Sequence, residues 1–188
     1  MLHRLLLVLA LIAVPAGAIA DVIDARHFEI AQEEDGLKVS ADFGFDLSPR
    51  LDEALHHGVP LYFVVEFELV RPRWYWFDEK TASDKLVLRL LYHTLSRQYR
   101  VSRGAFYQNF ASLGEALRTM GTVRDWTVAE RDRVKSDEGY VASLRMRLDT
   151  TQLPKPFQVT ALTNREWTLA SDWVRVVFTA GRTGSASK

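Results

Sequence analysis

The sequence predicts a mainly β fold, an antiparallel two-sheet sandwich of immunoglobulin-like or related type with two short helices. Apolar and polar residues alternate along several segments, which is typical of strands that bury one face. Turn-forming residues separate these segments at short intervals, and no strand–helix–strand rhythm runs through the chain. These observations favour two packed antiparallel sheets, with a closed barrel as the alternative. The paired cysteines around a tryptophan that mark immunoglobulin domains do not occur in the sequence, so the topology stays open.

The first two strands form a predicted hairpin. Residues 37–47 alternate apolar with polar side chains, and residues 22–32 form a weaker strand pattern before them. The segment 33–36 joins the two as a turn, because Gly36 adopts a positive φ without steric cost.

Two short segments carry the start and stop signals of helices. Ser48 is a predicted N-cap, Pro49 suits the first helical turn, and Gly58 ends this first helix. Residues 112–115 form a predicted capping box, and Gly121 ends the second helix.

The middle of the chain predicts three more strands. Residues 60–77 form a long strand-like run, in which Pro72 predicts a bulge or an edge because proline cannot donate a hydrogen bond to the ladder. Residues 85–93 predict a further strand, and residues 98–102 are expected to pair with it across a turn.

The last third of the chain predicts the strands that complete the sheets. Residues 123–128 and 140–148 read as two strands joined by a charged hairpin. Residues 153–156, with the sequence Leu-Pro-Lys-Pro, predict a stiff extended connector. Residues 157–162 and 173–179 predict the two closing strands.

The N-terminus has the pattern of a secretory signal peptide. Arg4 supplies the positive charge, residues 5–14 are an unbroken apolar run, and residues 18–20 (Ala-Ile-Ala) fit the small-x-small rule of signal peptidases. Spanning the hydrocarbon core takes roughly 20 apolar residues, so this run is too short for a membrane anchor. We expect cleavage after Ala20 to remove the signal peptide (residues 1–20), and the mature protein to be periplasmic with no stable membrane insertion.

Composition narrows the classes of function and of site. The chain has no cysteine, which excludes disulfides, thiolate metal sites and a cysteine nucleophile. Lys and Arg together number 24, as do Asp and Glu, so no excess of charge favours nucleic acid as a partner. We expect residues 21–179 to form a single β-sandwich domain, followed by a disordered tail at residues 180–188, which are rich in Gly and Ser.

The residue patterns predict no catalytic residue, no cofactor-binding residue and no metal site. Glu66 and Glu68 share one face of a predicted strand, roughly 7 Å apart, and paired carboxylates of this kind hydrolyse glycosidic bonds in some enzymes. The other interpretation is a polar face balanced by Arg or Lys on a neighbouring strand. His56 and His57 point about 100° apart on a helix, so they cannot bind one metal ion together and are expected to be surface side chains. The sequence contains no hydrolase, zinc, dinucleotide or phosphate-loop motif.

The most distinctive stretch combines two guanidinium groups with aromatic rings. Its residues Arg71, Arg73, Trp74, Tyr75 and Trp76 form the candidate surface for a partner or a ligand. Consecutive residues of a strand point to opposite faces, so part of this aromatic set must leave the main core. The alternative is that both faces are covered, one by the second sheet and the other by a helix.

Several segments of the mature chain carry a resemblance to a known family. They are the Arg/Trp-rich residues 71–76, residues 99–102 (Tyr-Arg-Val-Ser), the proline segment 153–156, and the segments 165–167 and 171–173, which both end in Trp. Together they resemble the proteobacterial exported family known as domain of unknown function 4390. The resemblance implies a bacterial, exported protein with no assigned activity, often encoded near a membrane sensor kinase of the nitrogen-regulation type.

These observations lead to one functional hypothesis and two alternatives. We expect a non-enzymatic periplasmic accessory protein that binds an envelope or sensor protein. The first alternative is a binder of a small envelope ligand, such as a glycan, a lipid or a peptidoglycan fragment. The second is an uncharacterised hydrolase that uses Glu66, Glu68 or another carboxylate.

Overall fold

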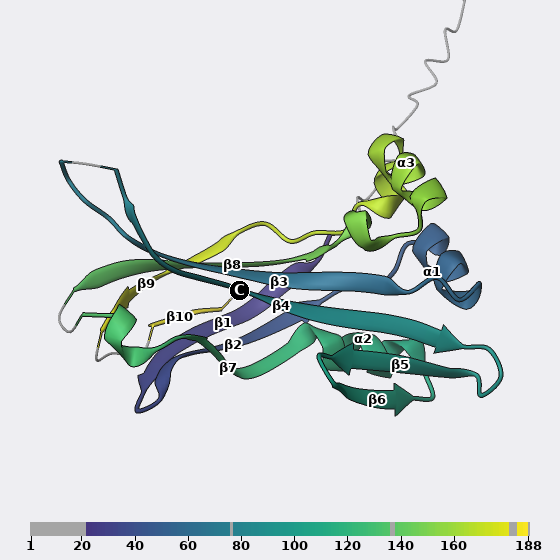
Figure 1. Cartoon of the computed structure of the whole chain (residues 1–188), viewed down its shortest axis with the longest axis horizontal. Helices are drawn as coiled ribbons and strands as arrows, with labels where there is room; N and C mark the ends of the chain where they lie inside the picture. Colours follow the sequence, from purple (N-terminus) through teal and green to yellow (C-terminus); the bar gives the residue numbers. More distant parts are fainter. Residues whose placement is uncertain (1–21, 76, 136–137, 181–183, 188) are drawn as a thin grey trace, which may run out of the picture.

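The computed structural model describes residues 22–75, 77–135, 138–180 and 184–187. The predicted signal peptide and Trp76 therefore lie outside the described residues. Figure 1 shows an elongated molecule in which the long strands run along the main axis.

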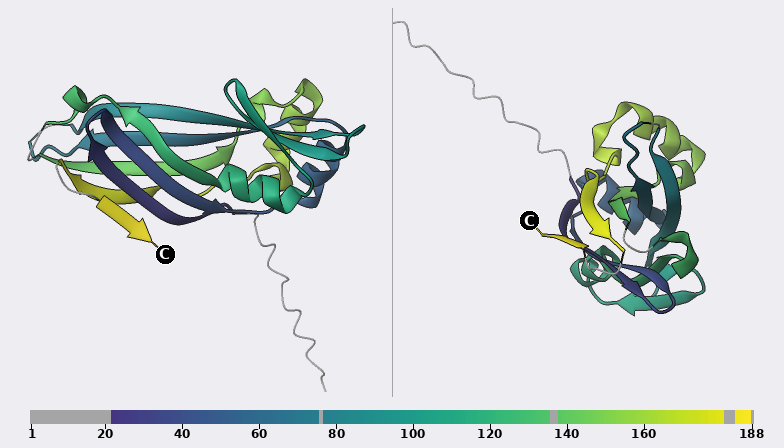
Figure 2. Two further views of the ribbon diagram at one scale, coloured as in Figure 1. Left: turned by 90° about the horizontal axis from the view of Figure 1, so that it is seen from below. Right: turned by 90° about the vertical axis from the view of Figure 1, so that its left-hand side faces the viewer.

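The described strands form two antiparallel sheets, which confirms the predicted two-sheet sandwich. Their orders are β10-β1-β2-β7 and β6-β5-β4-β3-β8-β9, so the described part of the chain has two open sheets rather than one closed barrel. Figure 2 shows β1 and β2 in one layer and β3 and β4 in the other. The strands are β1 (Asp24–Glu33), β2 (Gly36–Gly44), β3 (Leu61–Arg71), β4 (Glu79–His93), β5 (Gln98–Arg103), β6 (Phe106–Phe110), β7 (Thr122–Ala129), β8 (Gly139–Leu148), β9 (Val174–Thr179) and β10 (Gly184–Ser187).

Three α-helices lie at one end of the sandwich, where the sequence predicts two (Figures 1 and 2). In the first two, the hydroxyls of Ser48 and Ser112 accept hydrogen bonds from backbone N–H groups of the first turn, as predicted. The helices are α1 (Pro49–His56), α2 (Leu113–Gly121) and α3 (Lys155–Thr163), and single turns of 3-10 helix occur at Arg131–Arg133, Thr150–Gln152 and Arg165–Trp167.

Helix α3 replaces the strand predicted for residues 157–162 and the second half of the connector predicted for residues 153–156, so these predictions are wrong there. Leu153 and Pro154 are extended, as predicted. Pro154 is the N-cap residue and Pro156 lies in the first helical turn, where no intrahelical backbone N–H donor is needed. The side chain of Gln158 donates to the carbonyls of Thr151 and Leu153, both at 2.7 Å. The Phe157 ring packs 5.2 Å from the ring of buried Trp167. These tertiary contacts override the strand preference of the local sequence.

Strand β10 forms within the tail that the sequence predicts to be disordered. Residues 184–187 pair with β1, from Ser187 opposite His27 to Gly184 opposite Ile30. An exposed edge of β1 supplies backbone partners for any small-residue segment, so pairing here needs no apolar pattern. Strand β6 is a further element that the sequence patterns do not predict.

The predicted turn before β2 is confirmed, and its glycine is required. Gly36 has a φ of +145°, and a Cβ atom there would overlap the carbonyl oxygen of Ala129. The strand predicted over residues 60–77 is shorter, because β3 ends at Arg71, directly before Pro72. The turn that joins β3 to β4 projects from the end of the sandwich opposite the α-helices (Figure 1).

The core lies between the two sheets and depends on β3. Phe63, Val65, Phe67 and Leu69 are buried on its inner face. The Phe67 ring meets Trp126 of β7 edge-on, with ring centroids 6.4 Å apart. The indole N–H of Trp126 donates to Asp84 of β4 at 3.1 Å, so one side chain links both sheets by packing and by a hydrogen bond.

Replacing Phe67 with alanine should destabilise the domain strongly. Phe67 is only 1% exposed, so its truncation leaves a cavity at the sheet interface, and we expect a loss of about 3–5 kcal/mol. Urea unfolding followed by circular dichroism measures this loss. The control Val177→Ala, on an exposed side chain of β9, should change the free energy of unfolding by less than about 0.5 kcal/mol. Equal effects of the two substitutions would contradict the assigned core.

Candidate functional site

The turn between β3 and β4 presents three aromatic rings to solvent, and we name Trp74, Tyr75 and Phe77 the aromatic tip. They are 94%, 67% and 86% exposed, respectively. Trp74 and Tyr75 contact each other edge-on, with ring centroids 5.0 Å apart. The alternative in which a sheet and a helix cover these rings is therefore wrong for the three that the structure describes.

Ion pairs hold the base of the aromatic tip. Arg71 and Arg73 both bind the carboxylate of Glu79, which begins β4 and lies opposite Arg71 in the ladder. The backbone N–H of Arg73 also donates to Asp78 at 3.3 Å. Hydrogen bonds from Arg71, and then from Arg73, lower the pKa of Glu79, which keeps this carboxylate ionised. The two arginines therefore close the hairpin and are charge-compensated.

A second carboxylate fixes the hairpin base to β8. Arg71 donates to Glu138 at 2.6 Å, and the Tyr140 hydroxyl donates to the same carboxylate at 3.2 Å. The backbone N–H of Lys135 donates to that hydroxyl at 3.0 Å. Tyr140 is fully buried, and its burial raises the pKa of its hydroxyl, which stays protonated as a donor. The aromatic tip thus stands on a base anchored to three strands.

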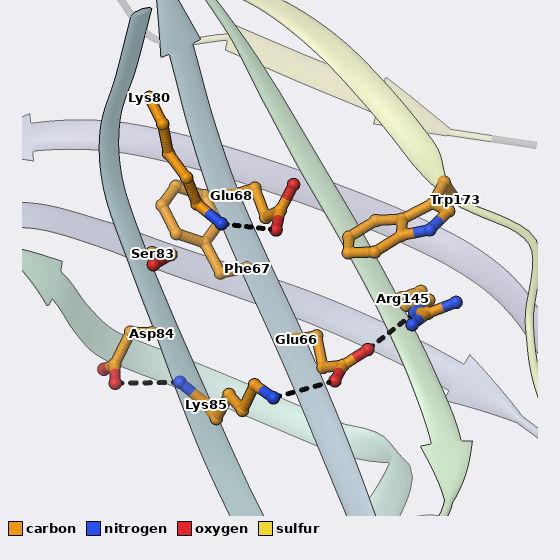
Figure 3. Close-up of a pocket in the computed structure, with 9 residues that line it drawn as sticks. All are labelled: Glu66, Phe67, Glu68, Lys80, Ser83, Asp84, Lys85, Arg145 and Trp173. Atoms are coloured by element: carbon orange, nitrogen blue, oxygen red, sulfur yellow. Dashed lines mark hydrogen bonds and ion pairs between the residues drawn. The ribbon is translucent and has the colours of Figure 1, made fainter.

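A buried carboxylate forms a second cluster on the outer face of the six-stranded sheet (Figure 3). Glu66 is only 7% exposed. It accepts hydrogen bonds from Arg145 at 2.6 Å and Arg147 at 3.1 Å, and the Lys85 ammonium lies 3.3 Å away. These cations stand on β4 and β8, the two strands beside β3. The predicted balance by Arg and Lys on neighbouring strands is confirmed, whereas Glu66 itself is buried rather than solvated.

The cations of this cluster keep Glu66 ionised, so its carboxylate has no proton to donate in acid catalysis. Burial by itself would raise the pKa of Glu66, but hydrogen bonds from Arg147 and Arg145 outweigh it and lower the pKa to about 2. Glu68, the second predicted carboxylate, is paired with Lys80 at 2.7 Å. A general acid requires a raised pKa, so Glu66 is a structural ion-pair partner rather than a proton donor.

The cavity beside this cluster has a volume of about 430 Å³. The guanidinium of Arg145 lies 4.5 Å from the centroid of the Trp173 ring, which closes one side (Figure 3). The sequence patterns do not identify Arg145 or Trp173 as neighbours of Glu66, because the pairing register of two strands cannot be predicted from the sequence of one strand alone. The alternation of Arg145 and Arg147 with buried residues along 140–148 is the only signal that points to them.

The two adjacent histidines lie at the end of α1 and contact its backbone and neighbouring rings. Nδ1 of His56 lies 2.9 Å from the Asp52 carbonyl, and Nδ1 of His57 lies 2.8 Å from the Glu53 carbonyl. The His56 ring also packs 4.7 Å from the Tyr92 ring. Across the described ranges, no three His, Asp or Glu side chains gather in a metal-binding arrangement.

A family model described as Domain of unknown function (DUF4390) matches residues 20–177. The chain belongs to this family. The match to the DUF4390 model includes the aromatic tip and the Glu66 cluster, and it ends before β10. No curated protein and no solved structure matches the chain. Within the described part of this DUF4390 chain, no helix has the length and apolarity needed to cross a membrane.

Neutralising Glu66 should destabilise the fold in a pH-dependent way. Its folded-state pKa of about 2 lies below the ordinary value of 4.5. The stabilisation from ionised Glu66 is therefore complete above about pH 4.5 and is lost as the pH falls toward 2, and this shift corresponds to about 3 kcal/mol. We expect Glu66→Gln to lower the free energy of unfolding by up to this amount at pH 7, with the difference shrinking below pH 4.5.

Urea titrations at a series of pH values measure this difference. The matched control is Glu68→Gln on the same strand face, whose exposed pair with Lys80 should contribute less than about 1 kcal/mol. An equal loss in both variants, or a gap for Glu66→Gln that stays constant with pH, would rule out the proposed role of the buried carboxylate.

Proposed function

We propose that this DUF4390 protein is an exported, non-enzymatic accessory protein of the periplasm that binds an envelope or sensor protein through its aromatic tip. The observation that carries the proposal is the exposure of Trp74, Tyr75 and Phe77 on a hairpin that projects from the sandwich. Large apolar rings in water are unfavourable, and their burial in a partner contributes about 25 cal/mol per Å² of apolar surface.

The shape of the tip favours a partner with a groove. A projecting turn is convex, so it inserts into a concave surface rather than enclosing a ligand of its own. Tryptophan and tyrosine are the residues most enriched among energetic hot spots of protein interfaces. The ion pairs of Arg71 with Glu79 and Glu138 hold the hairpin base in place, which lowers the entropy lost on binding.

The charge of the tip favours an apolar protein surface over an anionic membrane. Arg71 and Arg73 are bound to carboxylates, and the neighbouring Lys80 is bound to Glu68. Attraction to anionic lipid needs a cluster of uncompensated Lys and Arg residues, which this base does not offer. A largely neutral aromatic surface matches the apolar centre of a protein interface.

Three further observations support the export and the non-enzymatic role within this proposal. Residues 1–20 have the composition of a signal peptide, and the family match begins at residue 20, where the predicted leader ends. The strongly lowered pKa of Glu66 supports a structural role for this carboxylate, which is one of the two that the hydrolase alternative names.

Site-specific photo-crosslinking tests the partner. A photoreactive side chain at Tyr75 should give one discrete adduct in a Gram-negative envelope, because this position is buried on binding. The same group at Leu95, fully exposed in the β4–β5 turn at the other end, should not give it. The cross-linked protein, once identified and purified, should bind the wild-type chain directly. Trp74→Ala should weaken that binding by about 30-fold, the effect of losing a hot-spot side chain.

Any one of three results would contradict this proposal. The first is an adduct that forms equally from position 95, and the second is a purified candidate that binds Trp74→Ala as tightly as the wild type. The third is Trp74-dependent flotation of the chain with protein-free phosphatidylcholine vesicles. The last result would assign the tip to the membrane interface, where Trp and Tyr also concentrate. The thermal unfolding midpoint of Trp74→Ala should equal that of the wild type, because its side chain is exposed.

The mature N-terminus tests the compartment. Protein recovered from the periplasmic fraction of a Gram-negative host should begin at Asp21, as measured by mass spectrometry. Replacing Ala20 with lysine should block cleavage, because signal peptidase reads a small residue there. An intact Met1 on protein found in the cytosol would contradict export.

A further inference from the structure

A groove of about 700 Å³ lies on the outer face of the six-stranded sheet, toward the β5–β6 hairpin. The aromatic tip and this hairpin stand at opposite ends of β3 and β4 (Figure 1). The volume of the groove is in the range of small-molecule sites. The side chains of Arg89 and Arg100 line it, because their chain neighbours Leu88, Leu90 and Val101 are buried on the core side. The groove is also lined by Tyr62, Val87, His93, Ser102, Phe106 and Tyr107.

Each arginine of the groove lies over a tyrosine ring. Cζ of Arg89 is 5.9 Å from the centroid of the Tyr62 ring, and Cζ of Arg100 is 4.5 Å from that of Tyr107. Nε of Arg100 also donates to Asn109 at 3.0 Å. Stacking on a ring orients a guanidinium while leaving N–H donors at its edge available to another acceptor.

Neither arginine has a carboxylate partner among the described residues. The ion pairs on the same sheet face join Arg145 and Arg147 to Glu66, and none involves Arg89 or Arg100. Arg89 lies opposite Ser102 in the β4–β5 ladder, and Arg100 is two residues away from Ser102. The Cα atoms of the two arginines are therefore diagonal neighbours about 7–8 Å apart. Their guanidinium groups lie toward Tyr62 of β3 and Tyr107 of β6, so an anion over Ser102, which stands opposite both Arg89 and Tyr107, is flanked by both arginines.

A histidine in the groove supplies a polar atom that lacks a hydrogen-bond partner. Nε2 of His93 is buried and has no such partner within the described ranges. Buried polar groups of folded proteins nearly always have partners, so this atom points to a ligand or a water molecule. Ser102 lines the groove on β5, directly opposite Arg89 and two residues from Arg100. The groove thus combines two guanidinium groups, an imidazole and a hydroxyl.

We propose that this groove binds a phosphate monoester attached to an apolar or aromatic body. A phosphate monoester carries roughly −1.5 to −2 charges and three acceptor oxygens, which match two guanidinium forks and a hydroxyl better than the two oxygens of a carboxylate. Phe106 and Val87 line the groove, are largely exposed, and offer an apolar wall beside the arginines. The proposal is independent of the aromatic tip, because it uses a different surface.

Isothermal titration of the folded chain with phenyl phosphate tests this site. We expect saturable binding, weaker binding of benzoate and of inorganic phosphate, and none of phenol. Arg89→Gln and Arg100→Gln should each weaken binding by about tenfold or more, the effect of losing a hydrogen bond to a charged group. The matched control is Arg175→Gln, an exposed arginine of β9 on the same sheet, which should leave the affinity unchanged.

The outcomes of this test are distinct. Absence of binding, or equal weakening by all three substitutions, overturns the site in favour of none or of unspecific charge attraction. Binding of phenol or benzoate as tight as that of phenyl phosphate overturns phosphate recognition. Equal binding of inorganic phosphate overturns the role of the apolar wall.

A vesicle experiment separates the two sources of such a phosphate. Phosphatidic acid in phosphatidylcholine vesicles presents a phosphate monoester at a lipid surface. Capture that is lost in Arg89→Gln and kept in Arg175→Gln assigns the site to a lipid headgroup, whereas phenyl phosphate binding without capture assigns it to a soluble ligand. Thermal unfolding of each variant without ligand verifies that the fold is intact.

Discussion

Side-chain alternation along β3 is the constraint on which the rest of the structure depends. β3 pairs with β4 on one side and β8 on the other. Phe63, Val65 and Phe67 are buried between the sheets, and the intervening Glu66 lies on the outer face. A slip of one residue would exchange these faces and place a carboxylate in the apolar interior. Cations from both neighbouring strands oppose that slip, because they reach Glu66 only in the observed register.

The same hairpin explains why the aromatic rings stay in solvent. β4 has 15 residues and β3 has 11, and their turn extends past the other strands at that end (Figure 1). A sheet can cover only what lies opposite it, so Trp74 and Tyr75 have no layer above them. Arg71 compensates for the lost packing by joining the hairpin base to Glu79 and Glu138. Exposed rings on a fixed support are the physical basis of the proposed partner binding.

The outer face of the six-stranded sheet holds its arginines in two ways. Arg145 and Arg147 form ion pairs with the buried carboxylate of Glu66, and Arg147 also pairs with Asp149, which makes them part of the fold. Arg89 and Arg100 stack on tyrosine rings instead, which orients them without cancelling their charge. A chain with a formal net charge of zero thus has a locally positive groove, because ring faces replace carboxylates at one end of the sheet.

The sequence by itself determined the elements whose signals are local. The period-two pattern of residues 37–47 predicted a strand, which the structure has over Gly36–Gly44, and the capping hydroxyl of Ser48 begins a helix, because both depend on neighbours in the chain. The tertiary structure decided where distant segments meet. Residues 157–162 became helical against Trp167, residues 184–187 found the edge of β1, and Glu66 met cations from two other strands. Register and long-range contacts are properties of paired segments, so no single segment encodes them.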